Sequence, residues 1–201
     1  MIHLACDHPH TRRVNSTPMA FPAIFIDRDG VVIENRPAYV RAWADVSLFP
    51  QAARALAEVT LSPYKIVLVT NQSAIGRGLI SLETANQINA GILDLIHAQG
   101  GRIDAVYMCP HQPADACACR KPKPGLLLRA RDELELDLEH SIMIGDALSD
   151  VQTGQAAGVR TNVLLLTGRG VDQAANPEAA QMPPFLTFAD LHQALTALVL
   201  Q

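Results

Sequence analysis

The chain has 201 residues, of which 49% are hydrophobic and 18% charged, and its net charge is −4. This length suits a single domain with a sizeable core, and the acidic balance argues against binding to nucleic acid or to an anionic membrane surface. No apolar run reaches the roughly 18 residues of a membrane span. Residues 1–19 also lack the apolar core of a secretory signal, so we expect a cytoplasmic protein.

The predicted elements follow a polar segment, residues 1–20, that we expect to be a disordered tail. Residues 21–201 then form one domain. Its continuous apolar runs are typical of strands buried on both faces, and they lie at 23–27, 65–70, 105–109, 141–146 and 162–167. Helix-like segments lie between them, at 51–61, 81–100, 124–136 and 147–158. This alternation predicts right-handed βαβ units and an α/β fold with a central parallel sheet.

Polar side chains stand where four of these runs end, namely Asp27, Thr70, Cys109 and Asp146. The carboxyl ends of parallel strands share one edge of the sheet, and open α/β folds bind their ligands at that edge. Segments far apart in the sequence are therefore predicted to meet in one crevice.

Two acidic pairs reach this crevice. The stretch FIDRDG contains Asp27 and Asp29, and GDALSD contains Asp146 and Asp150. Carboxylates gathered in one place repel each other unless a hard cation lies among them, and Mg²⁺ prefers oxygen ligands. The sequence therefore predicts a magnesium site.

Groups that can hold a phosphate are predicted beside the carboxylates. The hydroxyl of Thr70 and the N–H groups of the loop that follows it can bind phosphoryl oxygens. Arg120 and Lys121 add two cations. Carboxylates, Mg²⁺ and cations are together typical of phosphoryl transfer, in which catalysis is largely positioning and neutralisation of charge.

Four short motifs carry a resemblance to a known family. DRDG, VTNQS, CRKP and GDALSD, spread between about residue 22 and about residue 170, resemble the motifs of the haloacid-dehalogenase-like (HAD) phosphohydrolases. With CPH and the following CxCRKP, the chain is similar to two bacterial branches, the heptose-bisphosphate phosphatases and the histidinol phosphatases. The resemblance implies a Rossmann-like three-layer α/β/α fold.

The resemblance also implies roles. Asp27 is the expected nucleophile and Asp29 the general acid and base. Thr70 and Lys121 are expected to stabilise the transferred phosphoryl group. Mg²⁺ is expected on Asp27, on the backbone carbonyl of Asp29 and on Asp146, with Asp150 just outside the ligands. Candidate substrate contacts are Asn71, Gln72, Ser73, Arg77 and Arg120.

A second metal site is predicted in the C-x-H-x5-C-x-C stretch, which contains Cys109, His111, Cys117 and Cys119. This Cys3His set matches a closed, structural zinc site, with buried thiols or a disulfide as the alternatives. The loop leads directly into Arg120 and Lys121, so zinc is expected to fix the direction of these cations.

The spacing of the motifs leaves no room for a cap domain, because only about 40 residues separate Asp29 from Thr70. Selectivity is then left to loops such as 35–39, after the first motif. We expect a monomer that acts on a small phosphorylated sugar, foremost a heptose 1,7-bisphosphate, because NQSAIGRG resembles a stretch of those enzymes. Ala147 stands where they commonly carry lysine. Histidinol phosphate, a polynucleotide 3′-phosphate and an inactive zinc-stabilised binding module are the alternatives.

Overall fold

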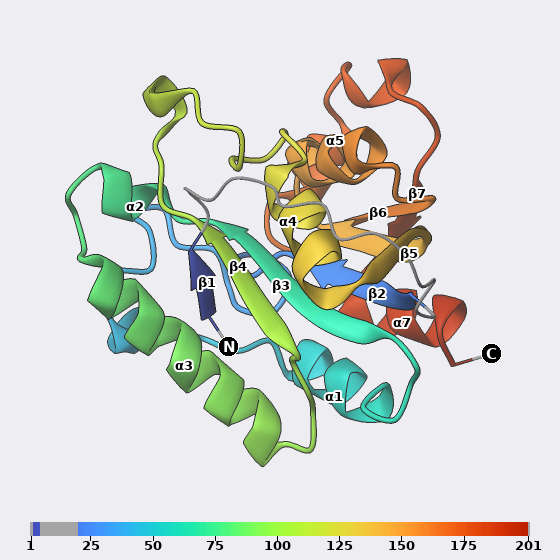
Figure 1. The fold of residues 1–201 in the computed structure, drawn as a ribbon, viewed down its shortest axis with the longest axis horizontal. Coiled ribbons are helices and arrows are strands. Elements are labelled where there is room, and N and C mark those ends of the chain that lie inside the picture. The colour runs from blue at the N-terminus through green and yellow to red at the C-terminus, as the bar shows by residue number, and fades with distance from the viewer. Residues whose placement is uncertain (1, 5–19, 201) are drawn as a thin grey trace.

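The computed structural model describes residues 2–4 and 20–200, and it contains one parallel sheet of seven strands (Figure 1). The order across the sheet is β1-β4-β3-β2-β5-β6-β7, and every neighbouring pair is parallel. The strands are β1 (Ile2–Leu4), β2 (Phe21–Ile26), β3 (Lys65–Asn71), β4 (Ala105–Cys109), β5 (Leu136–Gly145), β6 (Thr161–Leu165) and β7 (Leu186–Phe188). The predicted parallel sheet is thus confirmed.

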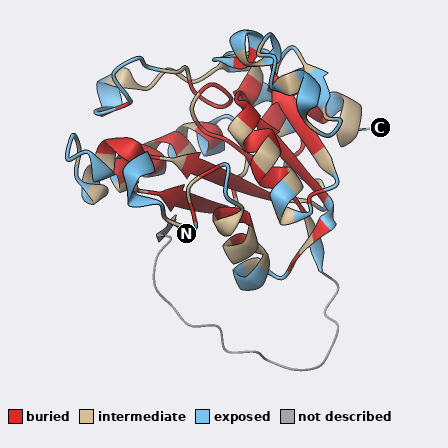
Figure 2. Ribbon diagram, turned by 90° about the horizontal axis from the view of Figure 1, so that it is seen from above, coloured by how far each residue is buried: buried red, intermediate tan, exposed pale blue. Residues whose placement is uncertain are grey.

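Helices cover both faces of this sheet and make three layers. The helices are α1 (Pro50–Glu58), α2 (Ser73–Gly76), α3 (Leu82–Ala98), α4 (Gly125–Leu134), α5 (Leu148–Ala157), α6 (Gly170–Ala174) and α7 (Leu191–Leu198). Ile24 and Ile26 of β2 belong to one apolar cluster with residues of α1, α3 and α7, whereas Ala23 and Phe25 belong to a second cluster with residues of α4. Both faces of β2 are therefore buried, which explains its continuous apolar sequence. Figure 2 shows that the strands in the interior of the molecule are largely buried.

The predicted boundaries agree with most of the observed elements. The Ser81 side chain accepts a hydrogen bond from the backbone N–H of Thr84 and caps α3, as a helix start of this kind requires. Strand β5 begins earlier than predicted, at Leu136, because Leu136 pairs with Phe21 before a register shift. Strands β1 and β7 and helices α2, α6 and α7 were not predicted. Most of the predicted tail lies outside the described residues, but residues 2–4 form the edge strand β1.

No cap domain interrupts the described part of the chain. Between β2 and β3 it contains only a short 3₁₀ turn (Trp43–Asp45) and α1. Between β3 and α4 lie α2, α3, β4 and a second 3₁₀ turn, Pro113–Asp115. Among the described residues, no helix is long and apolar enough to cross a membrane.

Candidate active site

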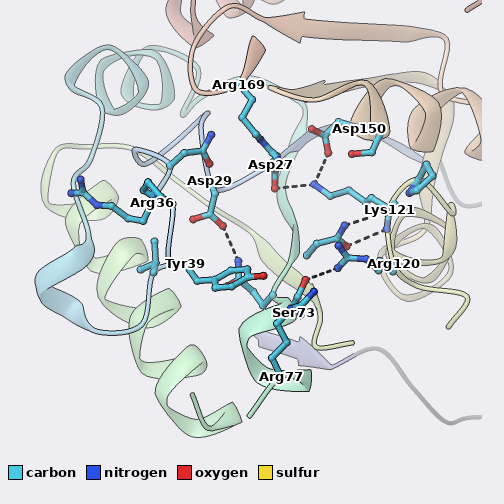
Figure 3. A pocket seen from close by; sticks show the side chains of 17 residues that line it. Asp27, Asp29, Arg36, Tyr39, Ser73, Arg77, Arg120, Lys121, Asp150 and Arg169 are labelled. Carbon is cyan, nitrogen blue, oxygen red and sulfur yellow. Dashed lines mark hydrogen bonds and ion pairs between the residues drawn. The ribbon is translucent and has the colours of Figure 1, made fainter. Parts of the chain in front are cut away.

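Three strands bring the predicted residues together at the carboxyl edge of the sheet. Asp27 follows β2, Thr70 lies near the end of β3, and Asp146 follows β5, and β2 pairs with both other strands. A cavity of about 790 Å³ opens there (Figure 3). Most of the predicted site residues outside the Cys3His set line this cavity. They are Asp27, Asp29, Asn71, Gln72, Ser73, Arg77, Arg120, Lys121 and Asp150. Thr70 and Asp146 are almost fully buried beside it.

Lys121 lies between two buried carboxylates. Its Nζ is 2.8 Å from Asp27 Oδ1 and 2.6 Å from Asp150 Oδ1, and it donates to the carbonyl of Val69 at 2.9 Å. Burial alone would lower the pKa of Lys121, but Asp150 and Asp27 outweigh it and raise this pKa to about 12. The ammonium therefore stays charged inside the protein.

At Asp27, by contrast, the effect of burial on the pKa outweighs that of the neighbouring cation. Burial raises the pKa of its carboxyl to about 7, and Asp150, Asp146 and Asp29 add to the rise, while Lys121 opposes it. Its Oδ1 also accepts the backbone N–H of Arg28 at 2.8 Å. A cation placed among these carboxylates would favour the ionised form, which is the form that can act as a nucleophile.

The carboxylate of Asp29 is oriented by a residue that the sequence interpretation overlooked. Arg28 Nη2 lies 3.0 Å from both oxygens of Asp29, and Arg28 Nη1 donates to Asn89 Oδ1 of α3 at 2.8 Å. Gln72 Nε2 donates to Asp29 Oδ2 and to Thr70 Oγ1, both at 2.8 Å. Arg28 lies between Asp27 and Asp29 in the sequence, and this position could have identified it as a site residue.

Asp146 is likewise surrounded by donors. Asn35 Nδ2 donates to its Oδ2 at 2.6 Å, and the guanidinium of Arg169 pairs with the carboxylate at 2.9 Å. Gly30 and Gly168 have φ angles of 89° and 56°, and a Cβ on either would lie within 2.3 Å of Asp146 Oδ2. Only glycine permits this approach. Arg169 was not among the predicted site residues, because no motif marks it.

Like Gln72, three more of the predicted substrate contacts, Asn71, Ser73 and Arg120, are engaged within the protein. Asn71 Nδ2 donates to the carbonyl of Lys121 at 3.1 Å and Asn71 Oδ1 accepts the Lys121 N–H at 3.1 Å, so Asn71 positions the Lys121 backbone. Arg120 Nη1 donates to Ser73 Oγ at 2.8 Å and to the carbonyl of His111 at 3.2 Å. Arg120 is therefore attached to the cysteine-containing loop as well as to the cavity wall.

The Cys and His side chains of that loop converge on one point. The Sγ atoms of Cys109, Cys117 and Cys119 are 3.3–3.6 Å apart, and His111 Nδ1 lies 3.6 Å from Cys109 Sγ and 3.5 Å from Cys119 Sγ. Hydrogen bonding from Cys119 lowers the pKa of Cys109 to about 5 although burial opposes this. The four side chains could hold a metal ion, as could the buried carboxylates of Asp27, Asp146 and Asp150.

Loop residues complete the rim of the cavity. Arg36 and Tyr39, from the segment predicted to contribute to selectivity, line it together with Arg77. Tyr39 has a φ of 66°, a left-handed conformation that is uncommon for a bulky side chain. Figure 3 shows Tyr39 beside Ser73 and Arg77 at the rim, on the side of the cavity opposite Arg169.

The chain resembles known proteins in sequence and in structure. A family model described as HAD-hydrolase-like matches residues 118–194. The D-glycero-beta-D-manno-heptose-1,7-bisphosphate 7-phosphatase of Vibrio cholerae is 38% identical over 162 residues, which cover 77% of this chain and 87% of the relative. The enzyme of that name from Photorhabdus laumondii is 37% identical over 183 residues, which cover 87% and 95%.

A solved structure agrees with these relatives. The D,D-heptose 1,7-bisphosphate phosphatase of B. bronchiseptica, complexed with magnesium and phosphate, superposes with a TM-score of 0.82 at 34% identity, covering 88% of this chain and 97% of that one. The parallel sheet and the paired acids after its central strand define a HAD-type phosphohydrolase. With relatives this similar over most of its length, the chain belongs to the HAD-like phosphatase family that includes these heptose-bisphosphate phosphatases, and it is a phosphomonoester hydrolase.

Proposed function

We propose that this enzyme removes the 7-phosphate of D-glycero-D-manno-heptose 1,7-bisphosphate. The observation that carries the proposal is the contact of Lys121 with Asp27 in an open cavity, next to Asp29. The relatives named for this reaction support the choice of substrate.

Asp27 is the nucleophile of the proposed reaction. Its carboxylate attacks phosphorus, the bond from phosphorus to the sugar oxygen breaks, and an aspartyl phosphate forms. Lys121 keeps its charge beside Asp27 and neutralises the oxygens of the transferred group. Gln72 Nε2 donates a hydrogen bond to Thr70 Oγ1. The Thr70 hydroxyl can therefore donate its own proton to the oxygens of the transferred phosphoryl group.

Asp29 moves the protons. It donates a proton to the sugar oxygen as that oxygen leaves, and it then accepts a proton from the water that attacks the aspartyl phosphate. Inorganic phosphate departs and the Asp27 carboxylate is restored. Arg28 and Gln72 hold the Asp29 carboxylate in a fixed direction, so both transfers occur at one position.

The donor set fits a divalent cation of the magnesium type, because the oxygens of Asp27, Asp146 and Asp150 lie within 4.8 Å of one another and are buried. Asp27, Asp146 and the backbone carbonyl of Asp29 would hold it. The oxygens of Asp150 are already paired with the Lys121 ammonium and the backbone N–H of Ala147. Asp150 therefore orients Lys121 beside the site and does not bind the cation directly. When bound, Mg²⁺ supplies positive charge that ionises Asp27 and stabilises the transferred phosphate.

Zinc is the metal we assign to the Cys3His cluster. Thiolates 3.3–3.6 Å apart are close to the S···S spacing of about 3.8 Å that a tetrahedral Zn–S distance of about 2.3 Å gives. Four protein ligands leave no open position, so this zinc is structural. It stabilises the loop whose His111 carbonyl orients Arg120.

The second phosphate of the substrate has cationic partners at the rim. Four arginines line the cavity, namely Arg36, Arg77, Arg120 and Arg169. They supply the charge that the Ala147 position lacks. Histidinol phosphate, with one phosphate, would engage fewer of these arginines.

Kinetics on a panel of phosphorylated metabolites test the proposal. We expect kcat/KM for heptose 1,7-bisphosphate to exceed that for histidinol phosphate at least roughly tenfold, a difference of about 1.4 kcal/mol in transition-state binding. Equal or higher efficiency on histidinol phosphate, or on a polynucleotide 3′-phosphate, would overturn the substrate assignment. We further infer that the enzyme acts as a monomer, which sedimentation would test.

A further inference from the structure

Arg169 lies on the buried carboxylate of Asp146. Its Nη2 donates to Asp146 Oδ1 at 2.9 Å and its Nε donates to Oδ2 at 3.2 Å. The Asp146 side chain is 0% exposed, whereas that of Arg169 is 57% exposed. An interior carboxylate is thus neutralised by a cation that reaches it from solvent.

The two oxygens of Asp146 have different partners. Oδ2 accepts from Asn35 Nδ2 at 2.6 Å and from the backbone N–H of Arg169 at 2.9 Å, and these donors orient the carboxylate. Within the described residues, the only hydrogen bond recorded at Oδ1 comes from the Arg169 guanidinium. Oδ1 is therefore the oxygen that a metal ion can take while the orienting bonds remain.

We propose that Arg169 and the divalent cation exchange at Asp146 Oδ1. Without the cation, the guanidinium supplies the counter-charge that a buried carboxylate needs. When the cation binds, the guanidinium has to leave, because two positive groups repel each other at one oxygen. It has room to do so, since Arg169 is largely exposed and lines the cavity. Arg169 is thus a positioning residue that stabilises the metal-free site and weakens metal binding. The inference rests on the magnesium site of the proposed function.

Calorimetric titration of Mg²⁺ into metal-free protein tests the exchange. For Arg169→Met we expect a Kd about tenfold lower than that of the wild type, equivalent to about 1.4 kcal/mol. The Tm of the metal-free variant should be lower than that of the wild type, and the gap should narrow at saturating Mg²⁺. Damage to the site would instead raise the Kd, so the direction of the change separates the two explanations.

Two further variants control for charge. Arg160→Met removes one positive charge at the other end of β6, from an exposed position, and should leave the Kd unchanged. Arg169→Lys keeps the local charge but cannot span both oxygens of Asp146, so its Kd should fall between those of the wild type and Arg169→Met. A Kd for Arg169→Lys equal to that of the wild type would mean that local charge alone is responsible, and it would overturn the exchange.

The test also separates this inference from the proposed function. A wild-type protein that binds Mg²⁺, together with an Arg169→Met variant that binds it no more tightly, would overturn the exchange alone. A wild-type protein that binds no Mg²⁺ would overturn both.

Discussion

Lys121 Nζ lies 2.8 Å from Asp27 Oδ1, although the two residues are 94 positions apart in the chain. The contact places a permanent cation on the nucleophile of the proposed reaction. It counters the burial that raises the pKa of Asp27, and it is itself maintained by Asp150 on the other side. The charges of the nucleophile, its counter-ion and the metal ligands therefore depend on one another. A substitution at any of them should change the pKa values of the others.

Asp27→Asn should abolish turnover. The amide has nearly the same shape but cannot form the aspartyl phosphate, so we expect kcat to fall at least roughly a thousandfold, while circular dichroism shows an intact fold. Release of inorganic phosphate is the measurement. Asp94→Asn, a change at an exposed position on α3 that does not line the cavity, is the control and should keep near-normal kcat. Near-normal turnover in a pure sample of Asp27→Asn would refute covalent catalysis by this residue.

The same substitution should change how stability depends on pH in protein freed of Mg²⁺. Folded Asp27 titrates near pH 7, against a reference pKa of 3.8, so the folded state binds the extra proton between these values. Its contribution to stability is full below the lower value and is lost as the pH rises through the higher one. Asp27→Asn escapes this loss, so its stability relative to the wild type should rise between pH 5 and pH 8, by on the order of 2–3 kcal/mol.

Urea denaturation at the two pH values measures this difference. Adding Mg²⁺ to the wild type should shrink it, because the cation favours ionised Asp27. A difference that does not change with pH would contradict the raised pKa.

Gly168→Ala should weaken the metal site. A Cβ at this position would lie 2.3 Å from Asp146 Oδ2 and would push the carboxylate aside. We expect the Kd for Mg²⁺ to rise at least roughly tenfold. Gly158→Ala is the matched control, since Gly158 also has a positive φ, of 83°, but has nothing within 4 Å of the added atom. Both variants should lose about 1–2 kcal/mol to backbone strain, and only Gly168→Ala should lose metal affinity.

Cys117→Ser should remove zinc and impair the cavity indirectly. Untreated wild-type protein is expected to contain about one zinc per chain, because thiolate sites bind zinc tightly. Loss of the metal should lower the Tm and loosen the His111 carbonyl that holds Arg120, so KM should rise. Cys6→Ser changes the one cysteine outside the cluster and should keep the zinc. Elemental analysis that finds no zinc in the wild type would contradict the structural site.

The sequence by itself determined the five inner strands, four of the helices that connect them and the edge at which the chemistry lies. Buried parallel strands have continuous apolar sequences, and the polar residues at their ends, Asp27, Thr70 and Asp146, must then share one edge. The spacing of the Cys3His set likewise predicted four ligands that do converge, because neighbours in one short loop need little help from the rest of the fold.

Only the tertiary structure decided the partners of those residues. Arg169 pairs with Asp146, and Arg28 donates to Asn89. Asn71, which was predicted to contact the substrate, binds the Lys121 backbone. Edge strands β1 and β7 also escaped prediction, since each has three residues and little pattern of its own. These features depend on contacts between distant segments, and such contacts are set by packing, which local sequence periodicity does not encode.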